Sequence, residues 1–468
     1  MARPAARAAC IPVALLALAA CGCRGTPVPP PVSAPPVGAA ATSPPHAAAT
    51  AAEVKAEFLH AWRGYERYAR GHDELKPVSR TAHDWHERTL LVTPVDALDT
   101  MLLMGLETEA AATREYIAAN LTFDHPISVK VFEVTIRVLG GLLSSYQLTG
   151  DRRLLALAED LGNRLLPAFD SPTGMPYMYV DLATGAHRGA ESNPAEIGTL
   201  LLEFGTLAKL TGRDEFYDKA KRALVAVYER RAATGLVGER IDVETGRWTR
   251  TVSHVGGRID SYLEYLLKCE RLFGDAGCGA MYRDSIAAVN RYLADDGPAG
   301  LWYGEADMTT GARGASVYGS LQAFLPGVLA LGGDLDRARR LQESGFRMWS
   351  LHGIEPEELD YARMTVTDPS YELRPEVIES AYVLHRLTGD ERYREMGRTF
   401  LAGLRQHCRT DAGYTVLKSV VTKEQGDMMY SFFLAETLKY LYLLFAPEAL
   451  DFDAVTFNTE AHPLRRTW

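Results

Sequence analysis

Five acidic residues lie near the start of long apolar stretches in this chain. Glu133, Glu196, Asp260 and Glu376 each lie 13 to 17 residues before a glycine that ends the stretch. Asp96 lies near the start of an apolar stretch of its own. Several carboxylates in one cleft can supply the acid and base of glycoside hydrolysis, bind a hard cation, or bind the hydroxyl groups of a sugar. The pattern therefore predicts one shared acidic pocket.

A second explanation applies to any single acid of this set. A carboxylate in the first turn of a helix interacts favourably with the helix dipole, by about 0.3 to 1 kcal/mol. This explanation is weaker for all five, because an acid on an otherwise apolar, buried helix is costly to desolvate. If these helices run the same way round the fold, their acids meet at one mouth.

The elements that must position these acids form a repeat. Breaks in the apolar pattern recur every 55 to 62 residues, a period typical of an array of helical hairpins. The breaks are Thr149-Gly150, Thr211-Gly212, Phe273-Gly274, Gly332-Gly333 and Thr388-Gly389. The stretch before each break is apolar all round and the stretch after it is amphipathic, so the repeating unit is an inner helix followed by an outer helix.

Two further units flank these five. One has residues 53–69 outside and 95–106 inside, and the other is a closing inner helix over 428–445. Seven inner helices paired with seven outer ones predict an all-α closed toroid. The pattern locates six of these outer stretches, at 53–69, 152–166, 215–228, 282–293, 335–349 and 391–404.

Composition limits the function of this single large domain. The chain has 468 residues and a formal net charge of −10, with no basic run, which argues against a nucleic-acid partner. There is no CxxC, HExxH, GxSxG or GxGxxG pattern. Of the six cysteines, Cys269 and Cys278 can form a disulfide in an oxidising compartment, but spacing alone does not determine the pairing.

The first fifty residues differ in composition from the rest. An apolar run over residues 11–20 ends in Leu-Ala-Ala-Cys, which resembles the lipobox of bacterial lipoproteins. The resemblance implies that residues 1–20 are a signal peptide and that Cys21 is acylated, leaving the chain lipid-anchored to a membrane in the bacterial cell envelope. An ordinary signal peptide is the alternative. Residues 21–50 are rich in proline and alanine and are expected to be a disordered tether before the domain of 51–468.

Five motifs in order resemble glycoside hydrolase family 47, the class I α-1,2-mannosidases. They are VFEVTIRVLGGLLSSYQLTGD (131–151), RIDSYLEYLLK (258–268), LRPEVIES (373–380), SFFLAETLKYLYLLF (431–445) and FNTEAHP (457–463). Further matches at 61–79, 93–106 and 169–177 extend the resemblance over nearly the whole chain after residue 55. The resemblance implies an (α/α)7 barrel, which agrees with the helix count.

The same resemblance implies roles for individual residues. Glu133 matches the general acid, Asp260 a second catalytic carboxylate and Glu376 the general base of an inverting hydrolysis. Thr459 matches the residue that binds Ca²⁺, which in turn holds two mannose hydroxyls. Residues matching the sugar subsite or the water shell of the cation are Arg137, Arg374, Glu379, Glu436 and Glu460, and Phe432 matches an aromatic side chain beneath the sugar ring.

The chain departs from the family pattern in one inner helix. Ser320 and Gln322 stand where a histidine or an acid is expected, and Tyr430 replaces an acid. The sequence around Ser320 is more similar to the ER degradation-enhancing mannosidase-like branch and its bacterial relatives. We expect these differences to alter the preference for the aglycone, the part of the glycan beyond the bond that is cut.

Together these features predict an exported, lipid-anchored, calcium-dependent exo-α-mannosidase that releases α-1,2-linked mannose from mannose-rich oligosaccharides as a monomer. One alternative is hydrolysis of another α-mannosidic linkage. A second is a glycan-binding protein with slow turnover. A third is a sugar epimerase with a helical toroid, which is expected to use histidines rather than calcium.

Overall fold

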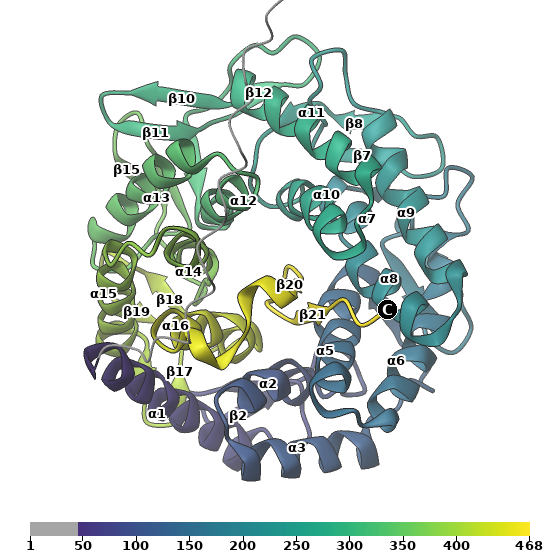
Figure 1. Cartoon of the computed structure of the whole chain (residues 1–468), viewed down its shortest axis with the longest axis vertical. Helices are drawn as coiled ribbons and strands as arrows, with labels where there is room; N and C mark the ends of the chain where they lie inside the picture. Colours follow the sequence, from purple (N-terminus) through teal and green to yellow (C-terminus); the bar gives the residue numbers. More distant parts are fainter. Residues whose placement is uncertain (1–44) are drawn as a thin grey trace, which may run out of the picture. The chain divides into compact units, whose positions relative to one another are not determined.

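The computed structural model describes residues 45–468, which form a ring of helical hairpins (Figure 1). The predicted signal peptide, the acylated Cys21 and most of the tether lie outside the described residues. Within the described part, seven inner helical segments line the ring and seven outer helices surround them. The predicted toroid of seven hairpins is therefore the fold of this chain.

Four of the seven inner segments are composite. The seven segments are α2 (Val92–Leu103); α4, η1 and α5 (Val131–Glu133, Val134–Leu139, Gly140–Thr149); α7 and α8 (Pro194–Gly198, Leu201–Thr211); α10 (Asp260–Phe273); η3 and α12 (Ser320–Phe324, Leu325–Leu331); α14 (Glu376–Thr388); η4 and α16 (Phe433–Thr437, Leu438–Phe445). The outer helices are α1 (Pro45–Tyr68), α3 (Glu107–Asn120), α6 (Arg152–Leu165), α9 (Asp214–Glu229), α11 (Ala276–Tyr292), α13 (Leu335–Ser350) and α15 (Arg392–His407).

Glycines end the inner helices as the repeat predicted. Gly150 follows α5 with φ of 74°, and Gly389 follows α14 with φ of 68°. Both residues adopt the left-handed conformation that ends a helix, and a side chain there would be strained. The outer helix begins within three residues of each glycine, so every such hairpin is tight.

The predicted opening unit was wrong in its pairing. The outer partner of α2 is α3, which the sequence pattern did not reveal, and α1 instead packs against α16 and closes the ring. Only Ala110, Thr113 and Ile117 of α3 are buried, so the helix lacks the regular apolar stripe that marks the other outer helices.

The predicted boundary of the tether was also wrong. Helix α1 begins at Pro45, so residues 45–50 belong to the folded domain. Proline is favoured in the first turn of a helix and alanine has the highest helix propensity, so an Ala- and Pro-rich composition does not by itself indicate disorder. Ala47 and Ala51 are buried in the core, which holds this turn in place.

Short antiparallel strands, which the sequence pattern did not reveal, connect the outer helices to the inner ones. The three-stranded sheets are β3 (Ser128–Lys130), β4 (Tyr179–Asp181) and β5 (His187–Arg188); β6 (Glu191–Ser192), β7 (Arg240–Asp242) and β8 (Trp248–Arg250); β13 (Val317–Gly319), β14 (Glu358–Asp360) and β15 (Thr365–Asp368). The two-stranded pairs are β1 (Glu74–Lys76) and β2 (Thr81–His83); β9 (Val252–Ser253) and β12 (Ala306–Asp307); β10 (Ala294–Gly297) and β11 (Gly300–Tyr303); β16 (Arg409–Thr410) and β17 (Gly413–Tyr414); β18 (Leu417–Ser419) and β19 (Glu424–Gln425).

The C-terminal hairpin lies inside the ring. Its strands are β20 (Val455–Phe457) and β21 (Pro463–Arg465), drawn in yellow at the centre of Figure 1. Strand β20 contacts α10 and strand β21 contacts α5, so the hairpin fills the space between inner helices. Its turn, between Phe457 and Pro463, carries Thr459.

One disulfide links an inner helix to the outer helix that follows it. Cys269 of α10 is bonded to Cys278 of α11, with their Cα atoms 5.9 Å apart, which confirms the pairing offered as one option by the sequence. Among the described residues, no helix combines the length and apolar character needed to span a bilayer.

Candidate active site

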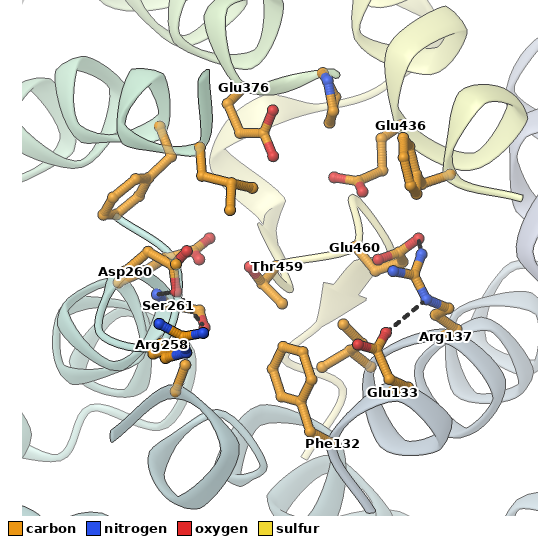
Figure 2. A pocket seen from close by; sticks show the side chains of 18 of the residues that line it. Phe132, Glu133, Arg137, Arg258, Asp260, Ser261, Glu376, Glu436, Thr459 and Glu460 are labelled. Atoms are coloured by element: carbon orange, nitrogen blue, oxygen red, sulfur yellow. Dashed lines mark hydrogen bonds and ion pairs between the residues drawn. The ribbon is translucent and has the colours of Figure 1, made fainter. Parts of the chain in front are cut away.

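A cavity of about 540 Å³ lies where the acid-bearing inner helices begin. Every one of the ten predicted site residues lines it: Glu133, Arg137, Asp260, Arg374, Glu376, Glu379, Phe432, Glu436, Thr459 and Glu460. Figure 2 shows Thr459 between Asp260 on one side and Glu436 and Glu460 on the other, with Glu376 nearby. The structure therefore brings together residues that lie more than 300 positions apart in the sequence.

Helix ends bring the carboxylates to this cavity. Asp260 is the first residue of α10, Glu376 is the first residue of α14, and Glu133 is the last residue of α4. Glu196 in α7 also lines the cavity, as the repeat predicted. Asp96 does not, because it is fully buried beneath the cavity in a network of charged groups.

Two π-helical segments place further charged groups. Arg137 lies in η1, the segment that directly follows Glu133, and Glu436 lies in η4. The Arg137 guanidinium donates from Nε to Glu133 Oε2 at 3.1 Å and pairs closely with Glu460. A π-helical turn widens the helix locally and is often found at functional sites. Here each of the two π-helical segments carries one charged residue that lines the cavity.

Phe432 forms an apolar surface between two cations of this cavity. The guanidinium carbons of Arg137 and Arg374 lie 5.5 and 5.8 Å from its ring centroid. The ring of Tyr430 stacks against the ring of Phe432, and the two centroids lie 5.3 Å apart. An aromatic face of this kind suits stacking against a sugar ring.

The turn that carries Thr459 is held by buried hydrogen bonds. Asn458 Nδ2 donates to Glu203 Oε1 at 2.7 Å, and Asn458 Oδ1 accepts from the backbone N–H groups of Glu460 and His462. Tyr265 donates to the same Glu203 oxygen at 2.6 Å. These contacts come from inner helices α8 and α10, so the position of Thr459 depends on the packed ring.

A fully buried charge network lies below this turn. Asp99 contacts Lys439 Nζ at 2.8 Å and His462 Nδ1 at 2.7 Å, and Asp96 contacts His462 Nε2 at 3.2 Å. Lys439 also donates to the carbonyl oxygen of Ala461 at 2.7 Å. His462 thus links Asp96 and Asp99 within one buried network.

The three predicted catalytic carboxyls differ in their electrostatic surroundings. Burial raises the pKa of Asp260 to about 7, and the nearby Glu264 carboxylate adds to this shift. Burial also raises the pKa of Glu376 to about 8, with Glu357 and Glu379 contributing. Burial alone would raise the pKa of Glu133 too, but Arg137 and Lys130 hold it below its ordinary value. Asp260 is therefore better suited than Glu133 to hold a proton at neutral pH.

The residues around Thr459 fit a hard cation bound largely through water. Burial raises the pKa of Glu436 well above its ordinary value and that of Glu460 to about 8, and neighbouring acids add to both shifts. A divalent cation would relieve this excess of negative charge. Among the described residues, no three carboxylates of this cavity have oxygens within 4.8 Å of one another. The acids are therefore too widely spaced for direct binding by three of them, whereas Ca²⁺ accepts hydroxyl, carbonyl and water oxygens.

A second cavity of about 450 Å³ shares a wall with the first. Ser320 and Gln322 line this second cavity and not the central one, and their expected effect on the aglycone preference stays a prediction. The Ser320 hydroxyl donates a hydrogen bond to Glu357 Oε2 at 2.9 Å. The Gln322 side chain accepts a hydrogen bond from the backbone N–H of Gly319 and donates one to the backbone carbonyl oxygen of Tyr303. Ser320 and Gln322 are both buried and lie in the short η3 segment that precedes α12.

Comparison with known proteins identifies the fold and the family. The sequence model described as "Glycosyl hydrolase family 47" matches residues 57–466. The chain belongs to glycosyl hydrolase family 47. Alpha-mannosidase I MNS4 of Arabidopsis thaliana is 41% identical to it over 435 residues, which cover 88% of this chain and 69% of that protein. The resemblance stated from the motifs is thereby confirmed.

Two more comparisons support this assignment. The ER degradation-enhancing alpha-mannosidase-like protein 2 of Homo sapiens is 38% identical over 448 residues, which cover 88% of this chain and 76% of that protein. The solved structure of alpha-1,2-mannosidase from Trichoderma reesei superposes with a TM-score of 0.83 at 28% identity, covering 89% of this chain and 99% of that one. The (α/α)7 barrel and the assignment as a glycoside hydrolase are confirmed.

Sequence reasoning missed several residues of the cavity in this family 47 chain. Lys130 contacts Glu196 at 2.6 Å and Glu133 at 3.5 Å. Its positive charge therefore partly offsets the negative charges of these two acids. Arg258 lines both cavities and has a φ of 81°, an uncommon conformation for a residue with a side chain. Its position two residues before Asp260 in the RIDSYLEYLLK motif was the signal that could have identified it.

Proposed function

We propose that this family 47 chain is a calcium-dependent, inverting exo-α-mannosidase that removes terminal α-1,2-linked mannose from mannose-rich glycans. One observation carries the proposal: Glu133, Asp260, Glu376 and Thr459 line a single cavity. The names of the relatives, which include alpha-1,2-mannosidases, support mannose as the sugar and α-1,2 as the linkage. The aromatic face of Phe432 and the ring of acids suit the apolar and hydroxyl surfaces of a sugar.

The C-terminal hairpin supports action at a chain end. Because the hairpin fills the ring and its Thr459 lines the cavity, a glycan enters this cavity from the mouth only. A terminal sugar fits such a closed cavity, whereas the middle of a polysaccharide does not. Arg258 lies on the wall shared with the second cavity, so the remaining sugars of the glycan would extend past this side chain.

In the proposed reaction the carboxyl of Asp260 protonates the oxygen that leaves with the aglycone. Glu376 accepts a proton from a water that attacks the anomeric carbon on the opposite face of the sugar. The bond to the aglycone oxygen breaks as the bond to the water oxygen forms, and the product is β-mannose. When bound, Ca²⁺ would hold sugar hydroxyls at Thr459 and supply positive charge that favours the ionised form of Glu376.

Calcium removal and product stereochemistry test the proposal together. We expect the protein to release mannose from α-1,2-mannobiose, to lose this activity in EDTA and to regain it with added Ca²⁺ because the cation holds the sugar. Proton NMR of the first product should show the β anomer. The control is the same assay with Mg²⁺ in place of Ca²⁺. Because Mg²⁺ demands a stricter coordination geometry, it should restore less activity.

Other outcomes would redirect the assignment. Persistent α-mannose as the first product would contradict inversion. Glycan binding without mannose release would favour a lectin-like protein, and release only from α-1,3- or α-1,6-mannobiose would favour another linkage. Activity that is unaffected by EDTA would reject calcium dependence.

The assignment of the general acid to Asp260 rather than Glu133 has a separate test. We expect Asp260→Asn to lower kcat/KM on α-1,2-mannobiose by about 10²- to 10⁴-fold, the usual contribution of a general acid. The loss should be much smaller with dinitrophenyl α-mannoside, because this leaving group needs no protonation. Initial rates for both substrates measure the effect. If the loss becomes smaller with dinitrophenyl α-mannoside in Glu133→Gln but not in Asp260→Asn, Glu133 is the general acid.

We also propose that the chain is exported and acylated at Cys21, on the basis of the Leu-Ala-Ala-Cys sequence at the end of the apolar run. Expressed in a bacterial host with an alkyne-tagged fatty acid, the full chain should become labelled. Cys21→Ala should abolish the label, and Cys23→Ala, two residues away, should keep it. Labelling that survives Cys21→Ala would reject acylation at Cys21, and an unlabelled chain with its mature N-terminus elsewhere would favour an ordinary signal peptide.

A further inference from the structure

A buried carboxyl group outside both cavities has no partner. Glu355 lies between α13 and β14, only 1% exposed, and no described residue hydrogen-bonds to either of its carboxyl oxygens. Native interiors rarely leave a buried polar atom unsatisfied, and a buried acid in particular needs either a partner or a proton. The protein atoms alone do not account for this side chain.

Two more unpartnered polar atoms belong to residues that interact electrostatically with Glu355. The hydroxyl of Tyr318 and the Oε2 atom of Glu376 are buried and accept or donate no hydrogen bond within the described residues. Burial, together with Glu355 and Glu376, raises the pKa of Tyr318 well above its ordinary value. Glu355 therefore interacts electrostatically with the predicted base, although it does not itself line the sugar cavity.

The available cation is already paired. Arg374 donates from Nε to both carboxylate oxygens of Glu357, at 3.0 and 3.1 Å. Burial and the Glu376 and Glu357 carboxylates raise the pKa of Glu355 well above its ordinary value, and Arg374 only partly opposes this. Two carboxyls that share a dry region with one occupied cation do not both ionise. Burial favours the neutral form of Glu355, and a neutral carboxyl can donate a hydrogen bond.

Unpartnered polar atoms that lie near one another in a protein interior are usually bridged by ordered water. We propose that Glu355, as a neutral acid, and Tyr318 hold an internal water against Oε2 of Glu376, so that Glu355 is a positioning residue for the catalytic base. The proposal rests on the proposed function for the role of Glu376. A hydrogen bond donated toward the ionised base orients its carboxylate and favours its charged form.

The pH profile of kcat/KM on α-1,2-mannobiose tests this role. Glu355→Leu keeps the volume but removes the hydrogen bond, so we expect kcat to fall about tenfold or more, the effect of losing a hydrogen bond to a charged group. The acid limb should move to higher pH by about one unit, because a less stabilised base is protonated more easily. Glu355→Gln keeps a neutral donor and should recover most of the loss.

The charged and titratable groups that face the two carboxyls set the direction of this shift. Those interacting with Glu355 or Glu376 are Tyr318, Glu357, Tyr371, Arg374, Glu379 and Glu436. If Glu355 were ionised in the working enzyme, Glu355→Gln would remove a like charge and move the acid limb to lower pH. That result would overturn the proposal.

Two further variants separate positioning from folding. Tyr318→Phe removes only a hydroxyl and should move the acid limb in the same direction by a smaller amount. Tyr282→Phe removes a buried tyrosine hydroxyl from outer helix α11 and should leave the profile unchanged. An unaltered profile in both Glu355→Leu and Tyr318→Phe would overturn the proposal even if Glu355→Leu loses stability.

A crystal structure of the unaltered protein gives a result that does not depend on activity. We expect an ordered water within hydrogen-bonding distance of Glu355, Glu376 and Tyr318. Direct contact between the two carboxyls, or an empty space between them, would overturn the proposal. If the protein releases no mannose but the water is present, the proposed function fails and the positioning of Glu376 by Glu355 stands.

Discussion

Replacing Glu376 by glutamine is expected to lower kcat for mannose release by about 10²- to 10⁴-fold, because the amide cannot accept a proton from the attacking water. The substitution preserves the shape of the first residue of α14, so glycan binding should change little. Initial rates on α-1,2-mannobiose and calorimetric titration of the uncleaved disaccharide measure the two effects. A large fall in kcat with retained binding identifies Glu376 as a group that acts in the chemical step.

The chain offers a matched control for this variant. Glu107 is the first residue of outer helix α3, just as Glu376 is the first residue of inner helix α14, but it is exposed and does not line the cavity. Glu107→Gln should leave kcat unchanged. If Glu376→Gln keeps a kcat within about tenfold of the unaltered chain, its role as the base is rejected.

Replacing Lys439 by methionine is expected to lower the free energy of unfolding by about 3 to 5 kcal/mol. Lys439 and Asp99 are both fully buried, and their side chains contact each other at 2.8 Å. Burial alone would raise the pKa of Asp99, but Lys439 and His462 hold it at about 2. Without Lys439, much less positive charge offsets the Asp99 carboxylate in the buried interior. Denaturant unfolding followed by circular dichroism measures the loss.

An exposed ion pair of similar geometry provides the control. Lys418 contacts Glu424 at 2.8 Å, but the two side chains are 63% and 59% exposed. Lys418→Met should change the free energy of unfolding by less than about 1 kcal/mol, since water screens a surface pair. Equal losses in the two variants would contradict the importance of the buried network, and so would a stable Lys439→Met protein.

The fold could be predicted largely from local pattern. The glycine after each inner helix and the change from apolar to amphipathic character are local signals, and they located most of the hairpins. Helix α3 escaped because few of its residues are buried, so no apolar stripe marks it. The strands of two to four residues escaped because such short segments show no periodicity. Their pairing depends on contacts between distant parts of the chain.

The site was predicted at the level of which residues gather, and less well at the level of what each one does. All ten residues singled out from the motifs line one cavity. Lys130 and Arg258 were missed although they adjoin the motifs, since a lone basic residue beside an acid has many explanations. Glu355 was missed because nothing in its neighbouring sequence marks a buried and unpartnered acid.

The sequence by itself determined the family, the toroid and the set of carboxylates that share a pocket, because motifs and helical periodicity are written in neighbouring residues. Only the tertiary structure decided how protons are distributed among these carboxylates. Glu133 lies beside Arg137 and Lys130, whereas Asp260 is buried near Glu264 with less compensation. A pKa depends on burial and on every charge within a few ångströms, and such neighbours come from helices that only folding brings together.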